Sequence, residues 1–368
     1  MKRIGILFGG KSAEHEISLL SAKNIFEAMD REKFEPVLIG IDKKGRWLIN
    51  DADKYLLNAD NPSLVSLNPD GKPVVLRTEN TGMLHAEGAG NIGLDAVFPV
   101  LHGPFGEDGA IQGFLKLADI PYAGPAVLGS AVGMDKDAMK RLLRDAGIPI
   151  GKFLVLKSHE KPLPFGEVQA ALSPVNESNS PFFIKPANMG SSVGISKVRN
   201  EAEYYAALKE AFLYDTKIII EEFIPGREIE CAVLGNEEPK ASIPGEIIPA
   251  HDFYSYEAKY LDEKGAALEI PAKLDEQTIR RVQELAIKVF KTLCCEGLAR
   301  VDFFLGGASG RRELIVNEIN TMPGFTRISM YPKLWEASGI GYTELITRLI
   351  ELAISRFEKE RLLKTSVI

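Results

Sequence analysis

Short apolar runs alternate with amphipathic segments over the first 124 residues of the chain. The run "RIGILFGG" predicts a buried strand ending in a glycine turn, and "SAEHEISLLSAKNIFEAMD" follows with apolar residues at helical spacing. Further strands are expected at "FEPVLIGID" and "LDAVFPVLHG", and "AIQGFLKLAD" is expected to return as a helix. Such alternation favours a parallel sheet with helices on both faces, so we expect an α/β fold here.

The chain has 368 residues, which is too long for one ordinary core. We expect an open parallel α/β domain over residues 1–124, a compact α+β domain over 125–224 and a third domain over 225–368. Residues 50–92 are rich in Asn, Asp, Pro and Gly, and predict an insertion with little core.

Composition excludes several classes of function. The formal net charge of −7 argues against a general nucleic-acid binder. The three cysteines lack a metal-binding or disulfide spacing, so we expect reduced thiols in the core. The first apolar run is too short for a signal-peptide core, and no stretch approaches the ~18 apolar residues of a membrane span. We therefore expect a cytoplasmic protein.

The stretch "PFFIKPANMGSSVGIS" places Lys185 at the end of an apolar strand, just before a loop rich in glycine and serine. Free backbone N–H groups in such a loop can surround phosphate oxygens while the lysine supplies a positive charge. The loop is not a Walker motif, because there the lysine follows the glycines. A surface turn beside a solvated lysine is the alternative interpretation.

The strings "RVDFF" and "VNEIN" predict two strands of one hairpin. Residues two apart on a strand share a face, so Arg300 and Asp302 point the same way, as do Glu318 and Asn320. Oxygen donors without His or Cys fit Mg²⁺, whereas an Arg–carboxylate pair on a solvated sheet is the alternative. The residues between them are apolar and expected to be buried: Val301, Phe303, Ile315 and Ile319.

Weaker signals lie elsewhere in the chain. Glu221, Glu222 and Glu228 suit adenine and ribose recognition, and equally a charged loop. Glu14 begins a helix after a glycine turn, so it either lines an anion or zwitterion pocket or serves the helix dipole. His102 stands where a strand leaves its sheet, a position common for both ligand contacts and structural histidines.

Taken in order, these features resemble the ATP-grasp superfamily. Six more specific strings resemble the D-alanine–D-alanine ligase family: "GGKSAEHEISL", "LHGPFGEDGAIQG", "KPANMGSSVGIS", "YEAKY", "ARVDFF" and "NEINTMPGFT". The resemblance runs from residue 4 to about residue 350. It implies a pre-ATP-grasp domain followed by a two-part ATP-grasp fold that binds ATP between two sheets.

The resemblance also implies an activity. Such ligases transfer the γ-phosphate of ATP to the carboxylate of one D-alanine, and the amine of a second D-alanine then displaces phosphate to form D-alanyl-D-alanine for peptidoglycan. The implied cofactors are two Mg²⁺ or Mn²⁺ ions, and the implied assembly is a homodimer through the N-terminal domain. D-serine or D-lactate as second substrate, or a non-catalytic nucleotide-binding module, are the alternatives.

Nucleotide and metal contacts follow from the resemblance residue by residue. Lys136 and Lys185 would contact phosphates, and Asp302, Glu318 and Asn320 would carry the metal ions. The remaining implied nucleotide-binding residues are Ser192, Glu221, Glu222, Ile224, Glu228, Phe253, Lys259 and Asn317.

Substrate contacts follow in the same way. Glu14 would bind the ammonium of the first D-alanine near His102, and Arg300 with the N–H of Gly324 would stabilise the oxyanion. A hydrogen-bonded triad of Glu14, Ser191 and Tyr260 would close the site.

Ser329 and Met330 would line the pocket of the second D-alanine, with Ser329 at its carboxylate. The neighbouring Arg327 departs from an apolar lining and is expected to alter how this pocket is filled. Relatives that make D-Ala–D-lactate resemble a pattern with histidine in the closing loop, whereas Tyr260 here is uncharged at pH 7. This favours an amine as the nucleophile.

Overall fold

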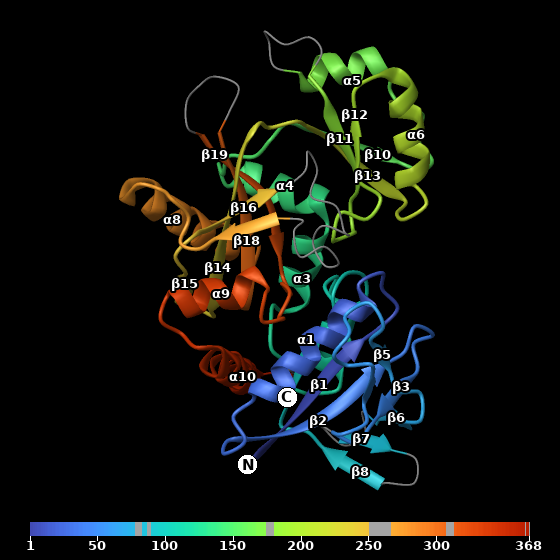
Figure 1. The fold of residues 1–368 in the computed structure, drawn as a ribbon, viewed down its shortest axis with the longest axis vertical. Coiled ribbons are helices and arrows are strands. Elements are labelled where there is room, and N and C mark those ends of the chain that lie inside the picture. Colours follow the sequence, from blue (N-terminus) through green and yellow to red (C-terminus); the bar gives the residue numbers. More distant parts are fainter. Residues whose placement is uncertain are drawn as a thin grey trace.

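The computed structural model describes residues 1–77, 83–86, 90–173, 180–249, 266–306, 313–364 and 366–367. The predicted site residues Phe253, Lys259 and Tyr260 lie outside these ranges. Figure 1 shows an N-terminal sheet at the lower end of the molecule and two further sheets at the upper end. The arrangement is a mixed α/β fold.

The described N-terminal residues form a seven-stranded sheet in the order β8-β7-β6-β3-β2-β1-β9. The pairs β1–β2 and β1–β9 are parallel, as predicted, whereas β3, β6, β7 and β8 continue the sheet antiparallel. The bounds are β1 (Lys2–Gly9), β2 (Phe34–Ile41), β3 (Trp47–Ile49), β6 (Lys72–Arg77), β7 (Met83–Ala86), β8 (Gly90–Gly93) and β9 (Ala96–Val100).

The prediction that residues 50–92 add little core is wrong. Besides β6–β8, this segment forms the pair β4 (Leu56–Leu57) and β5 (Ser66–Leu67). The ring of Tyr55 packs edge-on against Phe8 of β1, with 5.7 Å between ring centroids. Strand β3 pairs with the parallel strand β2, and β6 of the segment covers the other edge of β3, so the segment extends the sheet beyond the parallel strands. Its buried side chains include Tyr55, Val65, Leu67 and Val74.

A glycine turn connects β1 to α1 (His15–Ala28). Gly9 has φ +91°, and a Cβ there would lie 2.2 Å from the carbonyl oxygen of Ile41, so only glycine fits. The apolar face of α1 buries Ile17, Leu19 and Ile25 against the sheet. The turn thereby places Glu14, the residue before the helix, at the carboxyl edge of the parallel strands. Two further helices follow β9: α2 (Ala110–Leu117) and α3 (Val127–Met134).

Residues 136–222 contain a four-stranded antiparallel sheet in the order β10-β13-β11-β12, close to the strands predicted. Asp135 caps the first helix by accepting a hydrogen bond from the N–H of Ala138 (3.0 Å). The elements are α4 (Lys136–Asp145), β10 (Phe153–Lys157), α5 (Phe165–Leu172), β11 (Phe182–Pro186), β12 (Ser196–Val198), α6 (Glu201–Ala211) and β13 (Lys217–Glu222).

The C-terminal sheet has the path β17-β16-β14-β18-β19, with β15 paired to β14. Its strands are β14 (Gly226–Gly235), β15 (Lys240–Ala241), β16 (Gly245–Pro249), β17 (Ala266–Glu269), β18 (Gly297–Gly306) and β19 (Glu313–Asn320). Its described helices are α8 (Glu276–Thr292), α9 (Met330–Ala337) and α10 (Tyr342–Arg361).

The β18–β19 hairpin has the predicted pairing at its site end. Arg300 lies opposite Asn320, and Asp302 opposite Glu318. The register then shifts between Asp302 and Phe303, so Phe303 pairs with Val316 and Asn317 is the extra residue of a bulge. Val316 is therefore fully buried in place of Ile315, which is only half-buried, and the prediction for Ile315 is wrong.

The cysteines are free, and Cys231 and Cys295 are buried as expected. Cys294 is exposed, contrary to prediction, because it sits with φ 55° in the turn after α8. Within the described residues, no helix combines the length and apolarity that a bilayer crossing requires.

Arg356 of α10 ties the C-terminal helix to the N-terminal region. Its guanidinium is buried and donates to the carbonyl oxygens of Gly124 (2.7 Å) and Tyr122 (3.0 Å). It also lies 3.3 Å from a carboxylate oxygen of Glu296. One side chain of α10 therefore contacts both Tyr122 and Gly124 of the N-terminal region and Glu296, which precedes β18.

We predict that Arg356→Met lowers the free energy of unfolding by about 2–5 kcal/mol, because two buried carbonyls and a carboxylate lose their donor. Urea denaturation followed by circular dichroism measures this. Arg348→Met is the matched control on the same helix, where an exposed pair with Glu344 is worth below about 1 kcal/mol. Equal losses of unfolding free energy in the two variants would contradict the stabilising role of Arg356.

Candidate active site

Two adjoining cavities lie where the sheets meet. The inter-sheet cavity, about 290 Å³, lies between the four-stranded and C-terminal sheets. The junction cavity, about 580 Å³, lies between the N-terminal region and the C-terminal sheet. Both are lined by Ser191, Glu228, Asn317 and Glu318, so they share a wall. The predicted residues lining the inter-sheet cavity are Lys136, Lys185, Ser191, Ser192, Glu221, Glu222, Ile224, Glu228, Asn317 and Glu318.

A buried carboxylate between two lysines organises the inter-sheet cavity. The two oxygens of Glu221 each lie 2.7 Å from an ammonium, one from Lys140 of α4 and one from Lys185 of β11. Burial alone raises the pKa of Glu221, but the two lysines outweigh it and lower the pKa to about 2. Burial by itself lowers the pKa of Lys185, but the charges of Glu221 and Glu318 outweigh this effect, so the pKa of Lys185 is raised. Glu221 and Lys185 therefore stay charged at pH 7.

Lys136 lines the inter-sheet cavity beside the wall that the two cavities share. Its ammonium donates to the carbonyl oxygen of Met189 in the glycine loop (2.6 Å) and lies 3.7 Å from a carboxylate oxygen of Glu318. The side chain is nine-tenths buried. Helix α4 thus presents Lys136 and Lys140, four residues apart on one face, to the same cavity.

The glycine loop brings Ser191 against the N-terminal region. Ser191 and Ser192 have φ 50° and 61°, a conformation that non-glycine residues adopt at a cost of about 1 kcal/mol each. The Ser191 hydroxyl donates to a carboxylate oxygen of Glu14. Two members of the predicted triad therefore meet across 177 residues of sequence. The third, Tyr260, lies outside the described residues.

The hairpin forms the floor of the junction cavity. Nε and one Nη of Arg300 donate to the two oxygens of Asp302, both at 2.7 Å, and Asn320 donates to Asp302 at 2.9 Å. The Arg300 Nε also lies 2.9 Å from a carboxylate oxygen of Glu230 on β14. Arg300 is thereby held between two carboxylates.

His102 and Glu107 clamp the backbone of the "NTMPGF" loop. His102 Nδ1 donates to the carbonyl oxygen of Met322 (3.0 Å), while Glu107 accepts from the N–H of Met322 (3.0 Å). Because a carbonyl can only accept, Nε2 of the neutral ring is left to accept from the hydroxyl of Ser21 (3.2 Å). Burial lowers the pKa of His102, in keeping with a neutral ring. Burial and the charge of Glu14 raise the pKa of Glu107 to about 8.

The clamped loop leads to the predicted second-substrate residues. Gly324, Ser329 and Met330 line the junction cavity together with Glu14, His102 and Arg300. Arg327 does not behave as predicted: its guanidinium is exposed and lies 3.4 Å from Glu27 of α1. The charge of Arg327 is therefore directed toward α1.

Comparison with known proteins identifies the family. The family model described as D-ala D-ala ligase N-terminus matches residues 3–125, and the one described as D-ala D-ala ligase C-terminus matches residues 142–351. The D-alanine–D-alanine ligase of Oceanobacillus iheyensis is 53% identical and covers 99% of this chain and 98% of its own length. The D-alanine–D-alanine ligase A of Escherichia coli K12 is 49% identical over 99% of both chains.

The chain belongs to the D-alanine–D-alanine ligase family. Solved structures of similar ligases share its architecture. The D-alanine–D-alanine ligase of Coxiella burnetii superposes with a TM-score of 0.82 at 38% identity, covering 98% of both chains. The VanG D-Ala:D-Ser ligase of Enterococcus faecalis also gives 0.82, at 37% identity, covering 96% of this chain and 99% of its own.

Sequence reasoning missed several residues of this ligase-family cleft as site residues. Lys140 follows Lys136 at helical spacing, so helix periodicity offered a signal for it. Glu230 lies two residues after Glu228 on β14, so strand periodicity offered a signal for it. Glu107 stands within "LHGPFGEDGAIQG", but only the fold brings it to a loop more than 200 residues later.

We predict that Glu221→Gln destabilises the protein by about 3–5 kcal/mol at pH 7, because Lys140 and Lys185 lose their shared buried carboxylate. The folded pKa of Glu221 is lowered, so its contribution is complete above the unfolded value of 4.5 and disappears as pH falls toward 2. Urea unfolding measured from pH 7 to pH 3 should therefore show that the difference in unfolding free energy between wild type and variant becomes smaller below pH 4.5. Glu344→Gln, at an exposed pair, is the control.

Proposed function

We propose that the chain catalyses ATP-dependent ligation of two D-alanine molecules to D-alanyl-D-alanine through a D-alanyl phosphate. The main observation in support of this reaction is that the two cavities adjoin and share a wall. Lysines suited to phosphates line one, Glu14 and Arg300 line the other, and Glu318 and Ser191 belong to both. Full-length identity of 49–55% to curated relatives named D-alanine–D-alanine ligase supports the same reaction.

The inter-sheet cavity suits the nucleotide. Lys136 and Lys185 would contact ATP phosphates, since both ammonium groups are largely desolvated and already fixed by carboxylates. Ser192 and the loop backbone would cover the phosphates. Glu221, Glu222, Ile224 and Glu228 would contact the nucleoside, with Asn317 at the cavity wall and with Phe253 and Lys259 from the segment outside the described residues.

A hard divalent cation fits the donor set of the hairpin. Asp302 and Glu318 face each other across the strands, and Asn320 adds an amide oxygen, which is the ligand chemistry that Mg²⁺ and Mn²⁺ prefer. Among the described residues, no group of three or more His, Cys, Asp and Glu side chains is placed to hold a metal ion. The ligands would therefore be two carboxylates and an amide from the protein, together with phosphate oxygens from the nucleotide. The bound ions would neutralise charge on the phosphates.

The junction cavity suits the two amino acids. Glu14, fixed by Ser191, would bind the ammonium of the first D-alanine, and His102 would line its side. Arg300 would face the oxygen that gains charge when the second amine attacks, together with the N–H of Gly324. Ser329 and Met330 would receive the second D-alanine, and Tyr260 would complete the triad.

The choice of second substrate favours D-alanine. Among the solved structures, a D-alanine–D-alanine ligase at 38% identity and a D-Ala:D-Ser ligase at 37% are equally similar, and the preference for D-alanine is supported by the curated relatives at 53% and 49% identity, which are D-alanine–D-alanine ligases. Tyr260 carries no charge that would repel an ammonium at pH 7. D-serine and D-lactate remain the competing substrates for the test below.

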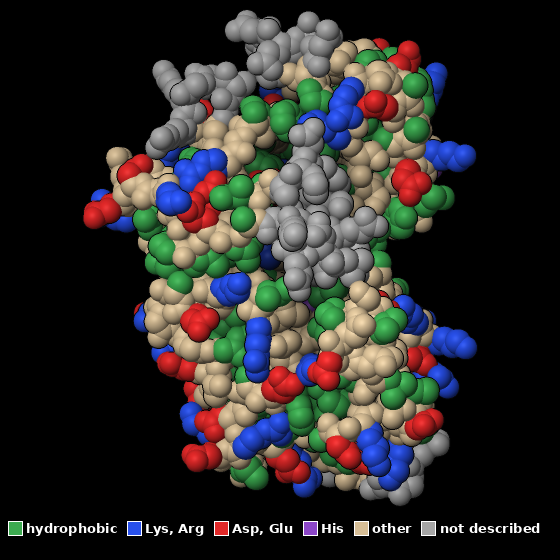
Figure 2. Space-filling view, in the orientation of Figure 1, with side chains coloured by type: hydrophobic (Ala, Val, Ile, Leu, Met, Phe, Trp, Pro, Cys, Tyr) green, Lys and Arg blue, Asp and Glu red, His purple; other side chains and the backbone are tan. Residues whose placement is uncertain are grey.

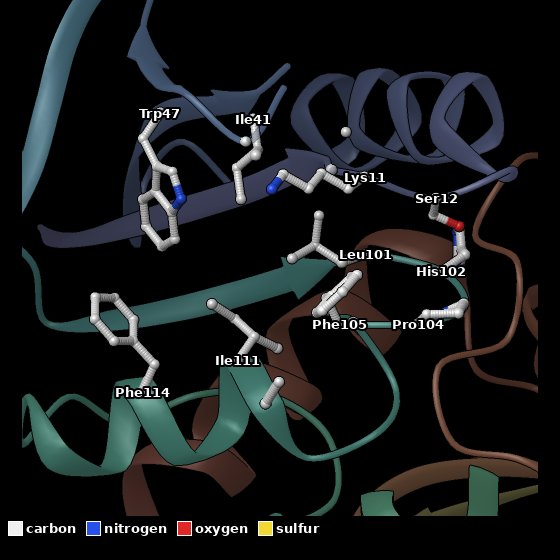
Figure 3. Close-up of a pocket in the computed structure, with 15 residues that line it drawn as sticks. Lys11, Ser12, Ile41, Trp47, Leu101, His102, Pro104, Phe105, Ile111 and Phe114 are labelled. Atoms are coloured by element: carbon white, nitrogen blue, oxygen red, sulfur yellow. The ribbon is translucent and has the colours of Figure 1, made fainter. Parts of the chain in front are cut away.

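A homodimer through the N-terminal domain belongs to the same proposal. Four large apolar side chains near α2 and α3 are exposed, namely Phe105, Phe114, Leu117 and Leu128. Phe105 and Phe114 line an apolar pocket of about 330 Å³, and at one side of it the rings of Trp47 and Phe114 pack edge-on with 5.6 Å between centroids (Figure 3). Exposed apolar surface of this kind is typical of a covered interface. The cytoplasmic location also stays a prediction.

The function is tested by phosphate release with ATP, Mg²⁺ and D-alanine, followed by mass spectrometry of the products. We expect D-alanyl-D-alanine as the main product, also when D-serine or D-lactate is present in equal amount between pH 6 and pH 9. Omission of D-alanine is the control. A product that is mainly an ester, or phosphate release without any dipeptide, would contradict the proposal.

The metal site is tested by removing its donors one at a time. Asp302→Ala and Glu318→Ala should each reduce turnover at least 100-fold, and chelator-treated wild type should recover only with Mg²⁺ or Mn²⁺. Circular dichroism should show native folding in both variants. Full activity of the chelated enzyme would remove the metal from the proposal.

A further inference from the structure

The junction cavity is strongly acidic. Among the described residues that line it, six are acidic and only two, Arg300 and Lys333, are basic, although burial and the charge of Glu14 raise the pKa of Glu107 to about 8. The second amino acid enters with a carboxylate that takes no part in bond formation, and a charge placed in such a cavity needs an opposite partner. The six acidic residues are Glu14, Glu107, Glu228, Glu230, Asp302 and Glu318.

Of the two cations, Arg300 is already held by Asp302 and Glu230. Lys333 is different, since within the described part of the chain its ammonium has no carboxylate within 4 Å and no hydrogen-bond acceptor. It is half-buried and lines the junction cavity. A positive charge without a protein partner in an acidic cavity is the group best suited to an incoming anion.

The position of Lys333 on α9 places this charge beside the predicted second-substrate residues. Side chains on a helix lean toward its N-terminus, so Lys333 lies over Ser329, four residues earlier. The Ser329 hydroxyl shares a hydrogen bond with the Thr326 hydroxyl (2.7 Å) and accepts from the Thr326 N–H (3.0 Å). A Cβ on Gly324 would lie 2.9 Å from that hydroxyl, so the predicted oxyanion donor is in contact with the same group.

We propose that Lys333 binds the carboxylate of the second amino-acid substrate and makes the cleft prefer a nucleophile that carries one. This inference rests on the proposed ligase function and adds a specificity-determining residue to it. The ammonium of Lys333 donates hydrogen bonds to the carboxylate, while the amine of the same molecule points toward Arg300 and Gly324. Loss of such a charge-assisted contact costs about 10- to 100-fold in affinity.

Arg327 provides a matched control. It lies six residues before Lys333 at the same end of α9 and carries the same charge. It is exposed, pairs with Glu27 and does not line the cavity. Arg327→Met therefore removes one positive charge from this end of the helix without touching the junction cavity.

The experiment is a competition between D-alanine and D-alaninamide in equal amounts, with products measured by mass spectrometry. D-alaninamide has no carboxylate to phosphorylate, so it can act only as the second substrate. The ratio of D-alanyl-D-alanine to D-alanyl-D-alaninamide should fall about 10- to 100-fold in Lys333→Met and Lys333→Gln. Lys333→Arg and Arg327→Met should keep the wild-type ratio within about threefold.

An unchanged ratio in both Lys333→Met and Lys333→Gln would overturn the role of Lys333 while leaving the ligase function intact. An equal fall in Arg327→Met would also overturn it, because the effect would then be a general one of charge. If the wild type makes neither product, the proposed function itself fails, and this outcome is distinct from the other two.

Discussion

Mutual neutralisation of buried charges is the constraint on which the cleft depends. Glu221 stands between Lys140 and Lys185, Arg300 stands between Asp302 and Glu230, and Lys136 lies near Glu318. A buried charge without a partner of opposite sign costs several kcal/mol. Each of these charges is therefore stable only when the element that carries its partner is also folded in place. The partners come from α4, β11, β13, β14, β18 and β19, and the pairing therefore joins the two upper sheets of Figure 1.

The same arrangement prepares the cleft for anionic substrates. The lysines of the inter-sheet cavity are desolvated and oriented before any phosphate arrives, so little reorganisation is required on binding. On the outer surface, Lys and Arg side chains are interspersed with Asp and Glu (Figure 2), which agrees with the argument against a general nucleic-acid binder. Inside the cleft, single lysine and arginine side chains are fixed among more numerous acidic ones, and phosphates and a substrate carboxylate would enter beside these lysines and arginines.

A second constraint links the N-terminal region to the chemistry. His102 and Glu107 hold both sides of the Met322 peptide group, and the N–H of Phe325 donates to Ser21 of α1 (3.3 Å). The loop that carries Gly324 is therefore positioned by residues among the first 107, so the proposed pocket for the first substrate and the proposed oxyanion site are held together. Sequence spacing offered no signal for this contact, because more than 200 residues separate its partners.

The sequence by itself determined the elements and the faces of their side chains. Strand periodicity was sufficient to place Arg300 and Asp302 on one face, and Glu318 and Asn320 on one face, because side-chain direction in a strand follows from local backbone geometry. The order of strands and helices was sufficient to predict the α/β class. Only the tertiary structure decided which charges meet. It paired Glu221 with two lysines, brought Glu230 to Arg300, turned Arg327 toward α1 and left Lys333 facing the cleft. The bulge at Asn317 and the core role of residues 50–92 were also decided there, since strand register and edge pairing depend on neighbours far away in the chain.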